Sequence, residues 1–160
     1  MKYKLGIDPG ISGALALLNE NNTLVDLADM PVMRLGKNKQ QVNAAELAKI
    51  ISLCQGNIIR EVATLEAYLE LVSAMPKQGV TSMFNFGVSL GVIEGVLAAL
   101  SIPVYMVTPA SWKKRAGLTG KDKEAARTLA QQLYPAAELG MKKHIGRADA
   151  ILIARYGGKE

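Results

Sequence analysis

The segment LGIDPGISGALAL, residues 5 to 17, carries one acidic residue, Asp8, directly before Pro9 and Gly10. The apolar residues before Asp8 predict a short strand, and Pro-Gly predicts a turn after it. Asp8 therefore ends a strand, at the place where side chains begin to emerge from a sheet. Aspartate before Pro-Gly also serves simply as a turn former, so Asp8 alone supports either interpretation.

Two more segments carry acidic residues in similar places. In EVATLEAYLELV, alternation puts Glu66, Tyr68 and Glu70 on one face of a predicted strand, with Glu70 nearest its carboxyl end. Two glutamates on one face are hard to explain as core, although an exposed sheet face or an edge strand also accommodates them. Asp149 lies near the start of the predicted helix RADAILIARYG, where the helix dipole by itself favours an acid.

A strand-end aspartate, a glutamate on a neighbouring strand and a helix aspartate can converge at one edge of a sheet. Carboxylates brought together repel one another unless cations bind between them, and hard oxygen ligands select Mg²⁺ or Mn²⁺. Two such ions about 3.5–4 Å apart activate water and stabilise the leaving oxygen in phosphodiester cleavage. The acidic set therefore indicates a metal centre that acts on phosphodiesters.

Turn formers and apolar periodicity divide the chain into short elements. We expect strands at 3–8, 13–19, 23–30, 61–72 and 102–107. Helices are expected at 43–55 and 80–100, in a short segment after Thr108, in a further segment that ends at about residue 134, and at 144–156. This order predicts an α/β fold with a mixed five-stranded sheet and helices packed on it, in a single domain over residues 1–160.

The composition suits a globular cytoplasmic protein. Apolar residues make up 49% of the chain and charged residues 21%. The longest uncharged span, 78–93, contains polar residues and is shorter than the ~20 apolar residues of a membrane span. The N-terminus lacks a signal-peptide pattern, and the lone Cys54 suits a reducing compartment. We therefore expect a cytoplasmic location and no membrane contact.

Positive charge is concentrated near the C-terminus. From Thr108 onward there are 11 Lys or Arg against 5 Asp or Glu, in a chain of net charge +5. Such asymmetry suits a polyanion such as nucleic acid, and a solvated basic face explains it about equally well. The candidate phosphate contacts are Lys113, Lys114, Lys121, Lys123, Lys142, Lys143 and Arg147. Trp112 and Phe84 are interpreted as core residues rather than base-stacking residues.

Glycines recur every four residues in the predicted helix 80–100, at Gly87, Gly91 and Gly95. Each glycine lowers helix stability, so the flat ridge they form implies close packing against another backbone. A contact between two copies of the chain and packing against its own sheet both fit this pattern.

Four stretches in order resemble RuvC-type Holliday junction resolvases, in particular the short bacteriophage versions with the ribonuclease H-like fold. They are LGIDPGISGALAL, ELVSAMPKQGVTSMFNFG, TPASWKKRAGLTGKDKEAARTLAQQLYP and GRADAILIARYG. The resemblance implies helices on both faces of the sheet and metal-dependent paired incisions in four-way DNA junctions by a homodimer. It implies two Mg²⁺ or Mn²⁺ ions and no nucleotide cofactor. In a phage, the compartment is the bacterial host cytoplasm.

The resemblance also assigns residues. It carries over Asp8 and Asp149 as catalytic metal ligands, and it selects Glu70 because the family's glutamate lies just ahead of the Met-Pro loop, leaving Glu66 as the runner-up. It places DNA-contacting lysines at Lys113 or Lys114 and at Lys123. In the loop SAMPKQG, we interpret Met75, Lys77 and Gln78 as residues that probe an opened junction centre.

One departure from the family pattern concerns a fourth ligand. The family usually has Asp or His three or four residues before the final acid, where this chain has Gly146 and Ile145. His144 is the nearest candidate, but five residues back is about 140° around an ideal helix from Asp149. From a turn before the helix, His144 would ligate a metal or act as a general acid or base. A solvent-facing histidine is the equally weighted alternative.

Two other functions compete with junction cutting. The missing fourth ligand allows a non-catalytic junction-binding protein. A strand-end acid beside glycine also occurs in actin-like and sugar-kinase-like ATPases, but those folds need two such domains and a second phosphate loop.

Overall fold

The computed structural model describes residues 1–60, 63–73 and 76–158. The strands are β1 (Lys2–Asp8), β2 (Ala14–Leu18), β3 (Leu24–Asp29), β4 (Val32–Arg34), β5 (Gln40–Val42), β6 (Thr64–Glu70) and β7 (Val104–Val107). The helices are α1 (Ala44–Arg60), α2 (Val80–Ala99), α3 (Pro109–Arg115), α4 (Lys123–Leu133) and α5 (Ile145–Tyr156), with a 3-10 turn, η1 (Lys142–His144), directly before α5.

The main sheet has five strands in the order β3-β2-β1-β6-β7. β1, β2 and β3 form an antiparallel meander, whereas β6 and β7 run parallel to β1. Ile7 pairs with Leu69, so the strands that carry Asp8 and Glu70 end side by side. The predicted mixed five-stranded sheet is confirmed, and its topology brings two of the three acidic positions to one edge.

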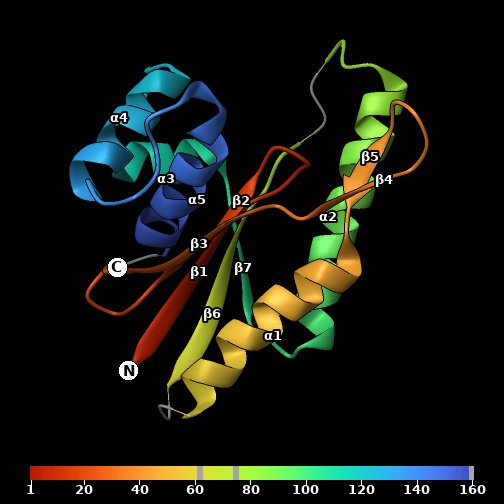
Figure 1. The fold of residues 1–160 in the computed structure, drawn as a ribbon. Coiled ribbons are helices and arrows are strands. Elements are labelled where there is room, and N and C mark those ends of the chain that lie inside the picture. Colours follow the sequence, from red (N-terminus) through yellow and green to blue (C-terminus); the bar gives the residue numbers. More distant parts are fainter. Residues whose placement is uncertain (61–62, 74–75, 159–160) are drawn as a thin grey trace.

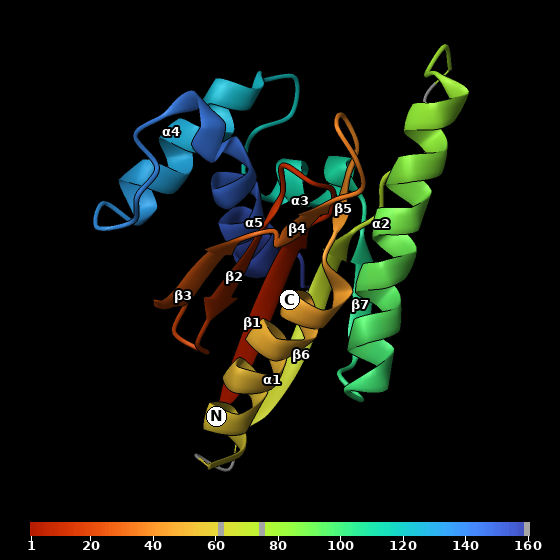
Figure 2. The ribbon, with the colours of Figure 1, turned by 45° about the vertical axis from the view of Figure 1, so that its right-hand side comes forward.

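Helices cover both faces of this sheet (Figures 1 and 2). On one face, α1 and α2 bury Leu47, Ile51 and Ile93 against alternate β1 residues such as Leu5 and Ile7. On the other face, α5 lies across the sheet, with α3 and α4 packed around it (Figure 1). Side chains at successive strand positions point to opposite faces, so each strand contributes to both cores.

Gly6 lets α5 pack directly on β1. A Cβ at Gly6 would lie 2.1 Å from the carbonyl oxygen of Ala150 and 2.5 Å from the backbone nitrogen of Ala154. Any side chain at this position would therefore push the helix away from the strand. This contact fixes how close α5 lies to β1, and hence where Asp149 lies relative to Asp8 at the end of the strand.

The structure adds elements that the sequence did not reveal. The segment 31–42, between the predicted strand 23–30 and the predicted helix 43–55, contains the β4–β5 hairpin, in which Met33 pairs with Gln41. α1 extends to Arg60, five residues beyond its predicted end, with Asn43 accepting a hydrogen bond from the Glu46 N–H at 3.1 Å as its cap. η1 precedes α5, so the last helix begins one residue later than predicted.

α2 is apolar and poorly covered. Its buried residues are Ser89, Ile93 and Leu97, which lie on one side of the helix. Gly87, Gly91 and Gly95 are exposed, and a Cβ on each would meet none of the described atoms within 4 Å. The glycine ridge therefore does not pack on the chain's own sheet. By length and composition alone, α2 is also the one described helix able to cross a membrane, which is weak evidence for a membrane span.

Phe84 on α2 corrects another prediction. Its side chain is 67% exposed, so it is not a core residue, whereas Trp112 is fully buried as predicted.

Candidate active site

Asp8, Glu70 and Asp149 line one open cleft of about 560 Å³ at the edge of the sheet. Asp8 ends β1, Glu70 ends the neighbouring β6, and Asp149 lies in the second turn of α5. Gly10, with φ +107°, and Gly13 turn the chain sharply between β1 and β2, and this turn forms one wall of the cleft. Residues far apart in the sequence are thereby brought to one place, and all three carboxyl groups are partly buried.

Burial and mutual repulsion make these carboxyl groups hard to ionise. Burial raises the pKa of Asp149 to about 7, and the nearby Glu70 adds to the rise. The pKa of Asp8 is well above its ordinary value, because of burial and the charges of Asp149 and Glu70. Burial also raises the pKa of Glu70. Lys113 and Lys123 oppose these shifts, but the effect of burial is larger, so the pKa of each carboxyl group stays above its ordinary value.

Trp112 positions Glu70. Trp112 belongs to α3, and its ring is fully buried. The indole Nε1 donates a hydrogen bond to Glu70 Oε2 at 2.6 Å. The Lys113 ammonium lies 5.4 Å from the centre of the same ring, a cation–π distance. Sequence reasoning interpreted Trp112 only as core and missed this role, because the contact joins residues 42 positions apart.

The donor set suits a hard divalent cation. It consists of carboxylate oxygens alone, and a cation between them would relieve the repulsion that raises their pKa values. The three carboxylates are not already grouped as ligands, since no three His, Cys, Asp or Glu side chains in the described ranges are close enough to hold one ion. The hydrogen bond from Trp112 fixes one Glu70 oxygen, Oε2, in its present position. The residue types and their charge thus fit a divalent cation. The carboxylate side chains would have to move closer together to bind it.

Four lysines line the cleft beside the acids: Lys113, Lys123, Lys142 and Lys143. They come from three segments of the chain, α3, the start of α4 and η1. The described lining of the cleft does not include Lys77, Gln78, Lys114 or Lys121, which are exposed elsewhere. Met75 lies outside the described residues. The candidate phosphate contacts therefore divide into a group at the acids and a group away from them.

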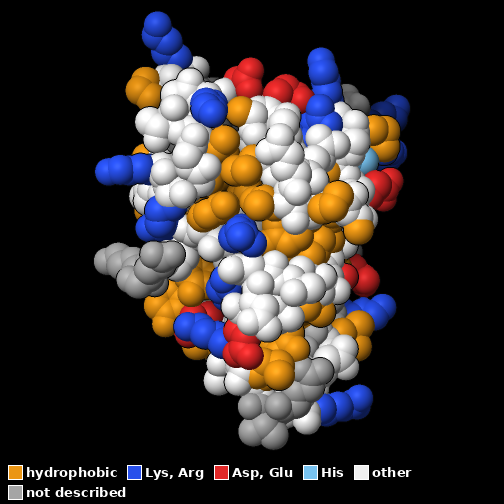
Figure 3. Space-filling model, turned by 90° about the vertical axis from the view of Figure 1, so that its left-hand side faces the viewer, with side chains coloured by type: hydrophobic (Ala, Val, Ile, Leu, Met, Phe, Trp, Pro, Cys, Tyr) orange, Lys and Arg blue, Asp and Glu red, His pale blue; other side chains and the backbone are white. Residues whose placement is uncertain are grey.

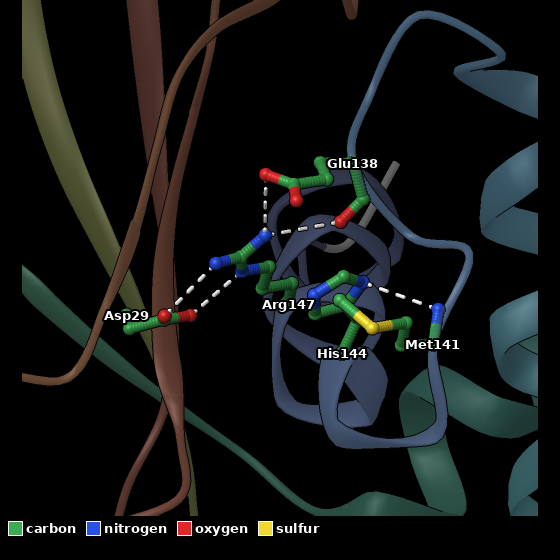
Figure 4. A network of polar contacts seen from close by, with 5 residues as sticks. All are labelled: Asp29, Glu138, Met141, His144 and Arg147. Carbon is green, nitrogen blue, oxygen red and sulfur yellow. Dashed lines mark hydrogen bonds and ion pairs between the residues drawn. The ribbon is translucent and has the colours of Figure 1, made fainter.

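His144 takes neither of the positions expected from the sequence. Its side chain is only 2% exposed, so the solvent-facing alternative is wrong. It is also absent from the described lining of the cleft. Nδ1 accepts a hydrogen bond from the Met141 N–H at 3.3 Å, and Nε2 has no partner among the described residues (Figure 4). The ring thus closes the turn that carries Lys142 and Lys143.

Arg147 is held in a polar network away from the cleft (Figure 4). Its guanidinium donates to both carboxylate oxygens of Asp29, at 2.7 and 2.9 Å, and to Glu138 at 3.2 Å. These contacts tie α5 to β3 and to the segment before η1. Arg147 therefore links elements of the fold in this structure, and its DNA contact stays a prediction that these hydrogen bonds do not favour.

At Gly146 the backbone of α5 packs directly against the β1–β2 turn, which leaves no space for a metal-binding side chain at this position. A Cβ there would lie 2.4 Å from the Ser12 carbonyl oxygen, so the start of α5 presses on the β1–β2 turn. We expect Gly146→Ala to lower the free energy of unfolding by about 1–3 kcal/mol. Gly56→Ala is the control, because its Cβ would meet none of the described atoms. Thermal unfolding of both variants checks this. An unchanged free energy of unfolding for Gly146→Ala would show that the β1–β2 turn can move to accommodate the added methyl group.

Known proteins of similar sequence and structure were found. No family model matches the chain. The Holliday junction resolvase MOC1, chloroplastic, of Chlamydomonas reinhardtii is 35% identical over 95 residues. That match covers 58% of this chain and 11% of the relative, so the chain spans about a tenth of that protein's length.

Two solved structures share the architecture over nearly the whole chain. T. thermophilus RuvC in complex with a Holliday junction substrate has a TM-score of 0.63 and 20% identity, over 96% of this chain and 90% of that one. A second Thermus thermophilus RuvC structure has a TM-score of 0.53 and 20% identity, over 95% and 90%. The chain therefore has the fold of RuvC and resembles the RuvC-type Holliday junction resolvases, as its motifs predict.

Proposed function

We propose that the protein is a structure-selective endonuclease that cuts branched DNA, with four-way junctions as its main substrate. The observation that carries this proposal is the cleft in which Asp8, Glu70 and Asp149 lie beside four lysines. Carboxylates for a cation and ammonium groups for phosphates are the two components that phosphodiester cleavage requires. The similarity to Holliday junction resolvases supports four-way junctions as the substrate.

Asp8, Glu70 and Asp149 would hold Mg²⁺ or Mn²⁺, most simply as two ions. Bound there, the cations would polarise a phosphodiester and lower the pKa of an attacking water. Trp112 limits how Glu70 turns, through the hydrogen bond to its carboxylate. Lys113, Lys123, Lys142 and Lys143 would fix the DNA backbone against the carboxylates. Phosphate contacts of this kind position the strand without reading its bases.

We further propose that two copies pair through α2. Val80, Phe84, Gly87, Gly91 and Gly95 fall on one face of the helix, opposite the buried Ser89, Ile93 and Leu97. This face exposes 83% of Val80 and 67% of Phe84, and the glycines leave room for a second backbone. A homodimer would bury an apolar surface that is costly to leave in water, and it would supply two active sites for paired cuts.

Gly91→Lys is expected to convert the dimer into a monomer, because a charged side chain would stand in the middle of the proposed contact. Sedimentation velocity of the variant and the parent checks this. Gly56→Lys is the matched control, since it adds the same charge to an open helix position on α1. Equal sedimentation of Gly91→Lys and the parent at dimer mass would place the contact elsewhere.

The test of the function is incubation of the protein with a labelled four-way junction in Mg²⁺, in Mn²⁺ or in EDTA. We expect paired nicks with either metal and none in EDTA, with the junction outcompeting a linear duplex of the same sequences. Binding without nicking in either metal would favour the second candidate, a junction-binding protein without catalysis. Two observations favour this second candidate. There is no room for a ligand side chain at Gly146, and the three carboxylates are not close enough together to hold one ion. ATP hydrolysis without nicking would support the kinase-like alternative.

The compartment follows from the same proposal. A nuclease of branched DNA works where the DNA is, so we place the protein in the cytoplasm, in the bacterial host cell if a phage encodes it. Pairing of two copies accounts for the apolar surface of α2 without a membrane, and neither a membrane nor a nucleotide cofactor enters the proposed reaction.

A further inference from the structure

A pocket of about 280 Å³ lies towards the amino end of β1, away from the acidic cleft. Residues of β1, β6, the β2–β3 turn and the end of α5 line it, and we call it the Lys4 pocket. Its described lining shares no residue with that of the acidic cleft. Figure 3 views the molecule from the side of the β2–β3 turn and shows basic and acidic side chains beside one another on the lower half of this face.

α5 separates the Lys4 pocket from the acids. Lys4, Gly6 and Asp8 alternate onto one face of β1, and α5 packs over Gly6. Lys4 lies four residues before Asp8, roughly 13 Å along the strand. Arg155 lies six residues after Asp149, roughly 9 Å along the helix. A ligand in the Lys4 pocket therefore would not reach the proposed metal site.

Two cations in the Lys4 pocket have no acidic partner among the described residues. The Lys4 ammonium donates to the side-chain oxygen of Asn22. The Arg155 guanidinium donates to the Tyr134 hydroxyl at 3.1 Å and lies over the Tyr134 ring. Neither cation is within ion-pair distance of a described Asp or Glu. Two positive charges are therefore left uncompensated in one pocket.

The acids near the Lys4 pocket are already paired with other cations. Glu66 pairs with Lys2 at 2.8 Å and also accepts from the Tyr68 hydroxyl at 3.0 Å. Glu20 lies 4.0 Å from the N-terminal amine and accepts from the Lys2 backbone N–H at 3.3 Å. These contacts hold both acids away from Lys4 and Arg155, which leaves the two cations for an anion from solution.

The uncompensated charges make the pocket favourable for an anion. Burial lowers the pKa of Lys4, and the charges of Arg155 and Lys2 lower it further. An anion between Lys4 and Arg155 would relieve this repulsion. The guanidinium can contact two oxygens of a phosphate, the ammonium acts as a point charge, and the Asn22 amide nitrogen makes no hydrogen bond with the described residues. The volume is below the roughly 300 Å³ of the smallest drug-sized sites, so the anion must be small.

We propose that the Lys4 pocket binds a terminal phosphate group, either inorganic phosphate or the end of a small phosphomonoester. Arg155 contacts two phosphate oxygens, and Lys4 and Asn22 donate to the others. Such a group carries a charge of about −1.5 to −2 at neutral pH, which matches two uncompensated cations. A DNA phosphodiester carries a single charge and matches them less well. This inference goes beyond the proposed nuclease and does not depend on it.

The test is a titration of the protein in EDTA, followed by the amide NMR shifts of Lys4, Asn22 and Gly158. Inorganic phosphate, methyl phosphate and dimethyl phosphate are compared with nitrate at constant ionic strength. We expect saturable shifts with inorganic phosphate, binding about tenfold or more weaker for dimethyl phosphate, and no saturation with nitrate. Methyl phosphate identifies the source: affinity equal to that of phosphate indicates a phosphomonoester, and weaker binding indicates the inorganic ion.

Variants locate the bound phosphate. Lys4→Gln and Arg155→Gln should each weaken phosphate about tenfold, whereas Lys4→Arg should retain most of the affinity. Arg155 also contacts Tyr134, so Lys4→Gln is the decisive variant. Lys49→Gln, which removes an exposed lysine of α1, is the matched control and should bind as the parent does. Any of three results overturns the proposal: no saturable shift with phosphate, equal affinity for dimethyl phosphate, or the same affinity in Lys4→Gln as in Lys49→Gln.

Discussion

Asp8→Asn is expected to reduce cutting of a four-way junction by about 10³-fold or more, while junction affinity stays within about twofold of the parent. Asp8 ends β1 in the cleft that Glu70 and Asp149 also line, and its pKa is raised by burial and by the charges of Asp149 and Glu70. Asparagine keeps the shape of the side chain but removes the charge that a divalent cation needs. The lysines that line the cleft are untouched, so DNA binding persists.

Single-turnover cleavage and gel-shift titration of the same preparation measure the two quantities. Glu66→Gln is the matched control, because Glu66 lies on the strand beside Asp8 but pairs with Lys2 at 2.8 Å and accepts from the Tyr68 hydroxyl at 3.0 Å. Cutting by Asp8→Asn at the parental rate would show that the assignment of Asp8 is wrong. Equal losses in both variants would indicate general damage to the sheet.

Asp149→Asn is expected to stabilise the protein in the absence of divalent cations. Burial raises the pKa of Asp149 to about 7, above its ordinary value near 4, so the folded state holds a proton that the unfolded state releases. The contribution of Asp149 to stability is therefore largest below about pH 4 and is lost as the pH rises towards 7. Asparagine carries no charge at any of these pH values and avoids the loss.

The expected gain at pH 8 is about 2 kcal/mol, after allowing for solvent screening of a partly exposed group, or roughly 5 °C in Tm. Thermal unfolding in EDTA from pH 4 to 8 checks it, and the difference between variant and parent should shrink towards pH 4. Added Mg²⁺ should raise the Tm of the parent more than that of the variant. Glu46→Gln, which removes an exposed carboxyl group on α1, should show neither effect. A parent whose Tm is independent of pH in EDTA would contradict the prediction.

The sequence was sufficient to predict the five-stranded sheet because its signals are local. Pro9-Gly10 marks a turn, and alternation marks β6 with Glu70 at its carboxyl end. Once β1 and β6 are adjacent and parallel, Asp8 and Glu70 must share an edge. The helices after β7 were likewise predicted from caps such as Thr108, which accepts from the Ser111 N–H at 3.3 Å.

The contacts that sequence reasoning missed are those between distant residues. The hydrogen bond from Trp112 to Glu70 and the Arg147 network depend on how α3 and α5 dock on the sheet, which no local pattern encodes. His144 was judged by ideal helix geometry, but it lies in η1, where the backbone turns differently and takes the ring into the interior. The β4–β5 hairpin was missed because three-residue strands are too short for alternation to be recognised.

The docking of α5 on Gly6 has a consequence for how the protein is made. α5 supplies Asp149 and also packs over one face of β1 and β2, so neither the core on that face nor the set of three carboxylates is complete until α5 has been synthesised. A chain truncated before α5 would therefore lack part of its core and part of the proposed metal site together.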